Sequence, residues 1–173
     1  EHWSGPDDAS FRFGVAHDLD FLYVAVDVRD SEVMNKPGGF PWEQDAVEVR
    51  LDARADPMRS NGIGKNELKD FLLLALTPGQ TDKDMFSHDT LPAGTKAVCV
   101  RSDQGFRAEF AIPVSYLNAQ QGAEWTAVRI NIALDDLDTE GPSHLWWRPD
   151  WRWPESYSGS GTFLRMPKAK NRS

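Results

Sequence analysis

Apolar and polar residues alternate along most of this chain with a period of two, the pattern of β-strands that bury one face. Every second residue is apolar in residues 11–15 and again in residues 22–28, and the polar segment 17–20 between them has the composition of a turn. We therefore predict a β-hairpin here. The opposite face of the second segment is also apolar as far as Asp27, which indicates a central strand covered on both sides.

The other strand-like segments differ in how clearly they are patterned. In residues 47–51 Val and Leu alternate with charged side chains, which predicts a strand with one buried face and one charged face. The apolar run 68–77, closed by a Pro-Gly pair, could be a short helix or a buried strand, and its position between strands favours the strand. We predict another hairpin from residues 95–101 and 106–112, followed by a single helical turn at 114–118. Two more strands are predicted at 125–134 and at 162–166.

About eight short strands with frequent turn signals and no convincing long helix predict an all-β fold. We expect an antiparallel β-sandwich of the immunoglobulin or jelly-roll type. Residues 1–167 are predicted to form a single domain, followed by a basic tail at 168–173. Loops of the length seen here usually carry the function of a rigid sandwich, and they fall at 31–45, 53–67, 79–94 and 135–160.

Charge and motifs exclude several classes of function. The chain has 27 acidic and 19 basic side chains and a formal net charge of −8, which argues against binding a nucleic-acid backbone. No apolar run approaches the ~18 residues of a membrane span, so no membrane insertion is expected. The single Cys99 excludes a disulfide framework and a multi-cysteine zinc site. No nucleophile elbow or phosphate-binding loop is present, which leaves no positive evidence for an enzyme.

One tryptophan stands directly before the charged strand. Trp42 follows the Pro- and Gly-rich segment 37–41, which would hold an indole out of the core. Glu48 projects from the charged face of the strand that follows. An exposed indole beside a fixed carboxylate is common in sugar-binding sites, because the indole stacks on the apolar face of a pyranose and the carboxylate accepts hydrogen bonds from hydroxyls.

A second group of tryptophans comes late in the chain. Four of the seven tryptophans are Trp146, Trp147, Trp151 and Trp153. Prolines and alternating arginines among them argue against a continuous internal strand. These indoles could plug the open end of the sandwich, but burying all of them would require a partner for each N–H group. At least one is therefore expected to be exposed for binding, and Trp146 is assigned to packing.

Acidic residues gather in two groups of turns. The first contains Asp18 and Asp30, and the second spans residues 135–138. Oxygen-rich loops suit Ca²⁺, which takes six to eight oxygen ligands. Solvated turn carboxylates are an equally open interpretation, and neither group has the spacing of an EF-hand loop.

The chain resembles a known family in several segments. Residues 21–30, 41–52 and 105–113 look like the family-nine carbohydrate-binding modules and their DOMON-like relatives, and the stretch Trp42-Glu43-Gln44-Asp45 is the most specific. The resemblance runs from Trp3 to Met166, nearly the whole chain. It implies a DOMON-like β-sandwich from which the strand that normally comes before this region is missing.

The resemblance implies a particular binding site. In such modules the end of a sugar chain lies between two tryptophans, one before the acidic strand and one before the last strand. Trp42 matches the first. Trp153 best matches the second, with Trp151 and Trp147 as alternatives. Glu48 falls where the family places a carboxylate that hydrogen-bonds the sugar.

Calcium and selectivity follow from the same resemblance. The family's calcium sites favour the turns of Asp18 and Asp30 as structural metal sites. The family also uses an arginine and an asparagine on a neighbouring strand, where the corresponding residues here are expected to be Leu72 and Leu74. Losing two polar partners changes how a site selects among sugar hydroxyls.

The residues and the resemblance together predict a non-catalytic carbohydrate-binding module for a glycan or oligosaccharide. The chain does not begin with Met, so we expect a processed or excised piece. The resemblance implies one module of a larger glycan-processing protein, extracellular or periplasmic. Two alternatives stay open. One is a DOMON-like haem domain for electron transfer, with axial ligands among Met34, Met85 and His88. The other is an interaction domain whose tryptophans dock against a neighbouring domain.

Overall fold

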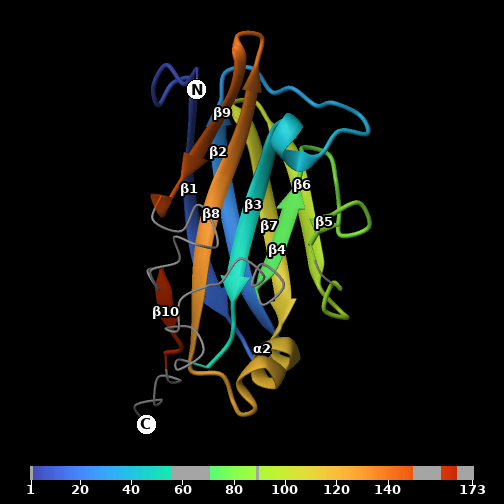
Figure 1. The fold of residues 1–173 in the computed structure, drawn as a ribbon, viewed down its shortest axis with the longest axis vertical. Helices are drawn as coiled ribbons and strands as arrows, with labels where there is room; N and C mark the ends of the chain where they lie inside the picture. Colours follow the sequence, from blue (N-terminus) through green and yellow to red (C-terminus); the bar gives the residue numbers. More distant parts are fainter. Residues whose placement is uncertain (1, 56–70, 89, 150–160, 167–173) are drawn as a thin grey trace.

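Two antiparallel β-sheets face each other and enclose one hydrophobic core (Figure 1). The computed structural model describes residues 2–55, 71–88, 90–149 and 161–166. One sheet has four strands and the other has six. The predicted antiparallel β-sandwich is therefore confirmed. None of the described helices is long and apolar enough to cross a membrane.

The four-stranded sheet consists of the two predicted hairpins. Its strands are, in spatial order, β1 (Ala9–His17), β2 (Phe21–Asp30), β7 (Gly105–Pro113) and β6 (Lys96–Ser102). All neighbours are antiparallel. The β1–β2 turn is closed by Asp18, whose side chain accepts hydrogen bonds from the backbone N–H groups of Asp20 and Phe21 at 2.8 Å each. This is the ordinary role of an Asp at the start of a tight turn.

The six-stranded sheet has β3 and β8 at its centre. Its strands are β10 (Thr162–Leu164), β8 (Ala127–Asp138), β3 (Ala46–Asp52), β4 (Leu72–Leu76) and β5 (Phe86–Ser87), and β9 (Gly141–Trp146) also pairs with β8. The ambiguous apolar run therefore contains a strand, as favoured from the sequence. A 3-10 helix, η1 (Pro41–Glu43), precedes β3. Helix α2 (Val114–Gln121) follows β7 and is longer than the single turn predicted.

The inward faces of both sheets supply the core. Val24 of β2 and Phe110 of β7 meet Val49 of β3 and Ile132 of β8 in one cluster, and each is at most 1 % exposed. Inward and outward residues alternate along these strands. The period-two pattern of the sequence thus reports the core face correctly.

The outer face of the four-stranded sheet is open. β2 is a central strand, as predicted, but Tyr23 is 38 % exposed and Ala25 is also exposed. The prediction that β2 is covered on both sides is therefore wrong. A two-layer sandwich covers each sheet on one face only, and the described residues place no third layer here.

A hairpin occupies part of a segment that was predicted as loop. β8 continues to Asp138, and β9 returns beside it after a turn at Gly141, which has a φ of 133°. Such a φ is accessible to glycine and strained for other residues. The sequence signal was weak because Gly141 and Pro142 start the strand.

Truncating an inward residue of β4 tests the sandwich. Leu74 is fully buried, so we expect Leu74→Ala to lower the free energy of unfolding by about 2 to 5 kcal/mol, through lost burial and the cavity left behind. Urea denaturation measures this change. Val100→Ala on the outer face of β6, where Val100 is 49 % exposed, serves as the control and should cost about 0.5 kcal/mol or less. Equal losses in the two variants would contradict this orientation of β4.

Candidate functional site

Strand β3 is buried on both of its faces. Its outer face carries Glu48, Arg50 and Asp52, and each of them is at most 8 % exposed. The prediction of a half-buried strand is therefore wrong for this face. Arg50 Nη2 lies 3.3 Å from Glu48 Oε2, and Arg54 Nε lies 3.0 Å from Asp52 Oδ1. Buried charges need such partners, so the outer face of β3 is a paired polar surface.

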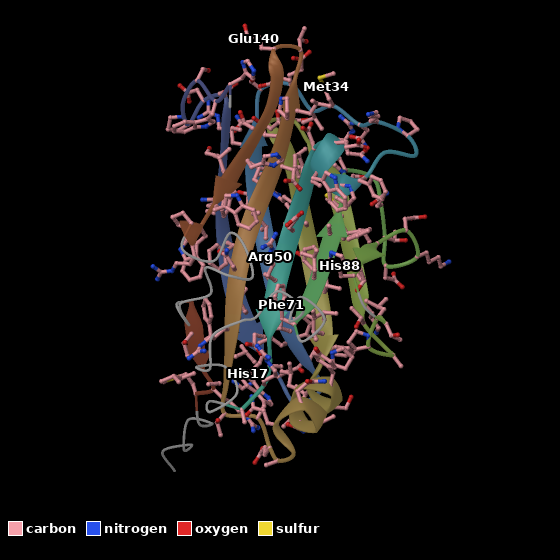
Figure 2. The ribbon with its side chains drawn as sticks, viewed as in Figure 1. His17, Met34, Arg50, Phe71, His88 and Glu140 are labelled. Atoms are coloured by element: carbon pink, nitrogen blue, oxygen red, sulfur yellow. The ribbon has the colours of Figure 1, made fainter. Side chains whose placement is uncertain are left out.

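One register row crosses five strands on this outer face. Directly paired residues of neighbouring strands point to the same side of a sheet. The row, called the outer row below, runs from β9 to β5 as Trp146, Ala133, Glu48, Ala75 and Phe86. It places the carboxylate between two alanines and ends in an aromatic ring on each side. Figure 2 shows this face of the sheet, with Arg50 labelled on β3.

Trp42 lies at the β5 end of the outer row. Its ring stacks parallel to the ring of Phe40, with centroids 4.8 Å apart and planes 3° apart. It also meets the ring of Phe86 edge to face at 5.3 Å. Trp42 remains 40 % exposed, so the prediction that the Pro- and Gly-rich segment holds this indole out of the core is confirmed. Sequence reasoning missed Phe40 and Phe86, which carry no motif of their own.

The two tryptophans at the end of β9 have different surroundings. Trp146 belongs to the outer row, and the guanidinium of Arg50 lies 4.4 Å from its ring centroid. Trp147 instead packs against the core, with its ring 4.8 Å from Phe13 and 5.8 Å from Phe163. The sequence assigned packing to Trp146 and a possible sugar contact to Trp147, and the structure reverses these positions. Adjacent residues face opposite sides of a sheet, so only the pairing register decides between them.

The other predicted positions near this face have different outcomes. Trp151 and Trp153 lie outside the described residues. Leu72 and Leu74 belong to the hydrophobic core and do not face the site. The β4 residues on the outer face are Leu73, opposite Arg50, and Ala75, opposite Glu48. The prediction was therefore wrong by one residue, which in a strand changes the face. Both outward residues are apolar, so β4 supplies no polar side chain here.

Glu48 is part of a buried network of ionisable groups. Its pKa is raised to about 7, chiefly by burial and also by the charge of Asp135, while Arg50 acts in the opposite direction. Asp135 is 2 % exposed, and its Oδ1 lies 2.7 Å from His144 Nδ1. Burial raises the pKa of Asp135 as well. Arg50 on one side and His144 on the other therefore flank two neighbouring carboxyl groups.

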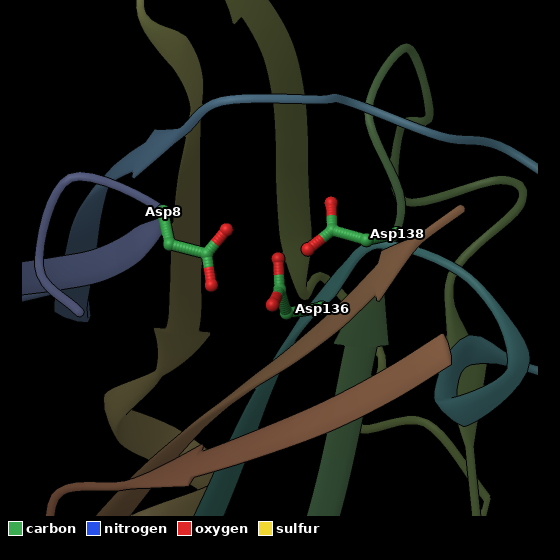
Figure 3. Close-up of side chains that lie close together, drawn as sticks. All are labelled: Asp8, Asp136 and Asp138. Carbon is green, nitrogen blue, oxygen red and sulfur yellow. The ribbon is translucent and has the colours of Figure 1, made fainter. Parts of the chain in front are cut away.

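A second cluster of polar groups lies where both sheets end. Asp30 at the end of β2, Asp45 just before β3 and Asp136 of β8 each offer a carboxylate oxygen within 4.8 Å of the others. These three residues are called the acidic group below, and all are buried. Asp136 also forms a group with Asp8 and Asp138, whose carboxylates are turned toward one another (Figure 3).

No basic side chain of the described residues forms an ion pair with the acidic group, and the charges of Arg101 near Asp30 and of His144 near Asp136 lower the pKa of these groups by less than burial raises it. Burial is the largest cause that raises the pKa of Asp45 to about 8 and that of Asp136 to about 7, and it raises the pKa of Asp30 too. Both carboxylate oxygens of Asp136, and Oδ2 of Asp30, are buried without a hydrogen-bond donor in the described part of the chain. Buried hard oxygen donors whose charge no ion pair balances fit a Ca²⁺ ion.

The predicted metal position at Asp30 therefore finds supporting surroundings, and the one at Asp18 does not. Asp18 lies in neither group of clustered carboxylates. Besides its two backbone donors, it accepts a hydrogen bond from the Tyr23 hydroxyl at 2.8 Å. These hydrogen bonds lower its pKa and give it a structural role in the turn. Asp45 was noticed only within the Trp-Glu-Gln-Asp stretch, because its distance from Asp30 in sequence hides their proximity.

The fold and the outer face define a class. A β-sandwich with an exposed indole at one end of an aromatic-bounded row, and a carboxylate at its centre, is a ligand-binding domain of the carbohydrate-binding-module type. Residues 1–153 match the family described as carbohydrate family 9 binding domain-like. The chain belongs to this family, as its resemblance in sequence predicted.

Known relatives agree with this assignment. The chain is 26 % identical over 167 residues to the exoglucanase XynX of Acetivibrio thermocellus, a match that covers 95 % of this chain but only 14 % of that protein. A family 9 carbohydrate binding module from Caldicellulosiruptor kristjanssonii in complex with cellotriose has a TM-score of 0.70 at 18 % identity, over 98 % of this chain and 82 % of that one. The complex with glucose gives 0.69 at 18 % identity, over 97 % and 82 %.

The comparisons do not favour the haem-binding alternative. Met85 packs against the core. Figure 2 shows Met34 near one end of the long axis and His88 near its middle. Met34 and His88 therefore come from separate places in the sandwich.

The acidic group predicts how stability depends on pH without a bound cation. Between about pH 4 and 8 its carboxyl groups keep protons in the folded chain that they lose in the unfolded chain. The free energy of unfolding is therefore highest below about pH 4 and falls as the pH rises toward about 8. For each carboxyl group that stays protonated we expect a loss of about 1 kcal/mol per pH unit, or about 2 to 4 °C in Tm, until the pH reaches its raised pKa. Thermal unfolding in a chelating buffer measures it. Asp45→Asn should flatten the decline, and an unchanged slope in that variant would contradict the assignment.

Proposed function

We propose that this domain binds the end of a neutral oligosaccharide on the outer face of the six-stranded sheet. The observation that carries the proposal is the exposed Trp42 at the end of a row centred on Glu48. The indole would stack on the apolar face of a sugar ring, and the carboxylate would accept hydrogen bonds from its hydroxyls. Trp153, which the family resemblance assigns as the second stacking residue, completes the proposal.

The surroundings of Trp42 and Glu48 support this assignment. The parallel contact with Phe40 and the edge contact with Phe86 hold the Trp42 ring in one orientation, so little side-chain entropy is lost when a ligand stacks on it. Glu48 is 5 % exposed and paired with Arg50. A hydroxyl that reached this carboxylate would form a charge-assisted bond away from bulk water, which strengthens it.

The two solved neighbours are complexes with cellotriose and with glucose, and the relative from Acetivibrio thermocellus is an exoglucanase. These names support a glucose-containing oligosaccharide as the first ligand to try. The proposal assigns binding and no catalysis to this domain. It also assigns the domain to a larger glycan-processing protein outside the cytoplasm, extracellular or periplasmic.

Removing the stacking residues tests the sugar site. Trp42→Ala and Trp153→Ala are each expected to weaken cellotriose binding about 10- to 100-fold, since a buried aromatic contact at the centre of an interface contributes about 2 kcal/mol or more. Isothermal titration calorimetry measures the Kd. Trp3→Ala is the matched control, because Trp3 is an exposed tryptophan far from this face. Its indole N–H donates a hydrogen bond to the carbonyl of Ala9 in the four-stranded sheet. Unchanged binding in both site variants would refute the proposal, as would flat heats for every sugar tried.

We further propose that the acidic group holds a structural Ca²⁺ ion. Asp30, Asp45 and Asp136 would ligate it, and Asp8 and Asp138 lie close enough to Asp136 to complete its coordination. When bound, the ion would supply the positive charge that these carboxylates lack. Extracellular calcium modules with affinities of about 10⁻⁴ to 10⁻³ M work at the calcium level outside cells, which is consistent with the proposed location.

Calcium addition tests this second site. At a concentration about 100 times its Kd, Ca²⁺ should stabilise the fold by about 2.7 kcal/mol, which is about 5 to 10 °C in Tm. Asp136→Asn should greatly reduce this increase, because it replaces a carboxylate shared by both groups with a neutral amide, which is a weaker ligand for Ca²⁺. Asp20→Asn in the exposed β1–β2 turn, at the other end of β2 from Asp30, removes the same charge far from the acidic group and should keep the full increase. Thermal unfolding with EDTA or CaCl₂ decides, and an equal Tm in both buffers would refute the site.

A further inference from the structure

The segment that carries Trp42 begins and ends at the acidic group. Asp30 comes directly before this segment, residues 31–44, and Asp45 directly after it. The two ends therefore meet at one cluster of carboxylates, although the indole lies over the outer face of the sheet. The hydrogen bonds of Asp30 and Asp45 at this cluster therefore determine how the segment is held.

Asp45 fastens the end of this segment. Its side chain accepts a hydrogen bond from the backbone N–H of Met34, and its own N–H donates to the Met34 carbonyl at 3.1 Å. Its Oδ1 accepts a hydrogen bond from the Leu137 N–H of β8 at 2.7 Å. The carboxylate of Asp45 therefore closes the segment on itself and ties it to the six-stranded sheet.

Asp30 fastens the beginning of the segment. Its Oδ1 accepts a hydrogen bond from the Glu32 N–H at 2.8 Å, while its Oδ2 is buried without a donor among the described residues. The Glu32 carboxylate accepts hydrogen bonds from the backbone N–H and hydroxyl of Thr139, at 3.2 Å and 3.0 Å. The entry to the segment is thus joined to the β8–β9 turn on one side and to the acidic group on the other.

Gln44 connects Asp45 to the aromatic part of the segment. Its Oε1 accepts a hydrogen bond from the Lys36 N–H at 2.9 Å, and its Nε2 donates to the carbonyls of Gly39 and Phe40 at 3.0 and 3.3 Å. Phe40 is the residue that stacks on Trp42. A displacement of Asp45 would therefore reach Trp42 through one buried side chain.

A cation changes the balance of forces in the acidic group. Three buried carboxylates this close repel one another when ionised, and both oxygens of Asp136, which is 3 % exposed, lack a hydrogen-bond donor in the described part of the chain. A bound ion would draw the oxygens of Asp30 and Asp45 toward one centre. Without it, the carboxylates repel one another when ionised and become weaker hydrogen-bond acceptors when protonated, and either state weakens the bonds that close the segment.

We propose that cation binding at the acidic group and sugar binding at Trp42 are coupled through the segment 31–44, so that each ligand raises the affinity for the other. This inference rests on the proposed sugar site. Coupling free energies are reciprocal, and coupled sites in one protein commonly change each other's affinity about 5- to 150-fold. We expect about a tenfold effect, because the bonds within the segment persist in part without the ion.

The first experiment measures both affinities on the intact chain. Cellotriose is titrated calorimetrically in EDTA and in saturating CaCl₂ at one pH and ionic strength, and the Kd should fall about tenfold when Ca²⁺ is present. In the reverse direction, Ca²⁺ is titrated with and without saturating cellotriose, and its Kd should fall by the same factor. Equal cellotriose affinities in both buffers, within twofold, would overturn the coupling.

Variants separate the coupling from the two sites. Gln44→Met keeps the length of the side chain and removes its hydrogen bonds, so it should reduce the effect of Ca²⁺ on the cellotriose Kd to about twofold or less while Ca²⁺ still raises Tm. Asp20→Asn at the other end of β2, with the same loss of charge as an acidic-group variant, should keep the full effect. A tenfold effect that survives in Gln44→Met would overturn the route through the segment.

The outcomes distinguish the coupling from the sugar site and the cation site on which it depends. If cellotriose and glucose give no heat with or without Ca²⁺, the sugar site itself is refuted and the coupling falls with it. If sugar binds but neither Ca²⁺ heats nor a Tm increase are found, the cation site is refuted, and the coupling with it. Sugar and Ca²⁺ that both bind with no mutual effect overturn the coupling alone.

Discussion

The burial of both faces of β3 is the constraint on which the rest of the structure depends. Its inner face fills the sandwich with Val and Leu, as alternation requires. Its outer face carries Glu48, Arg50 and Asp52 away from water, so each charge must find a partner within the sheet or beside it. The ion pair of Arg50 with Glu48, and the contact of Arg50 with Trp146, follow from this requirement. Polar groups on the outer face are thereby held in fixed positions, as a recognition surface needs.

The same constraint is met differently at the start of β3. Asp45 joins Asp30 and Asp136, and no basic side chain of the described residues forms an ion pair with them. Such a group exists either with protons, as the raised pKa values of Asp45 and Asp136 indicate, or with a cation in their place. Because the carboxylates come from both sheets, whatever neutralises them also holds the sheets together at this end.

Alternation predicted the strands that have a turn residue at each end and one apolar face. It therefore found both hairpins of the four-stranded sheet. It missed β9, which exists because β8 extends to Asp138 and offers an unpaired edge. It also did not predict that Glu48 is buried. Alternation shows that the two faces of a strand differ in polarity, but it does not show whether the polar face is exposed to water. In the site, Trp42 was found from its flanking Pro and Gly, whereas the choice between Trp146 and Trp147 needed the pairing register.

One register also separates the two candidate sites. Asp45 lies with carboxylates from both sheets, and Glu48, three residues later, points to the outer face. A shift of one residue in the pairing of β3 would turn Val47 and Val49 outward and bring the charges into the core, so this register is strongly fixed. The segment before β3 must then end at the acidic group and still carry Trp42 over the outer face. The link proposed between a cation at the acidic group and the indole therefore needs only ordinary strand geometry, with no long-range rearrangement of the sandwich.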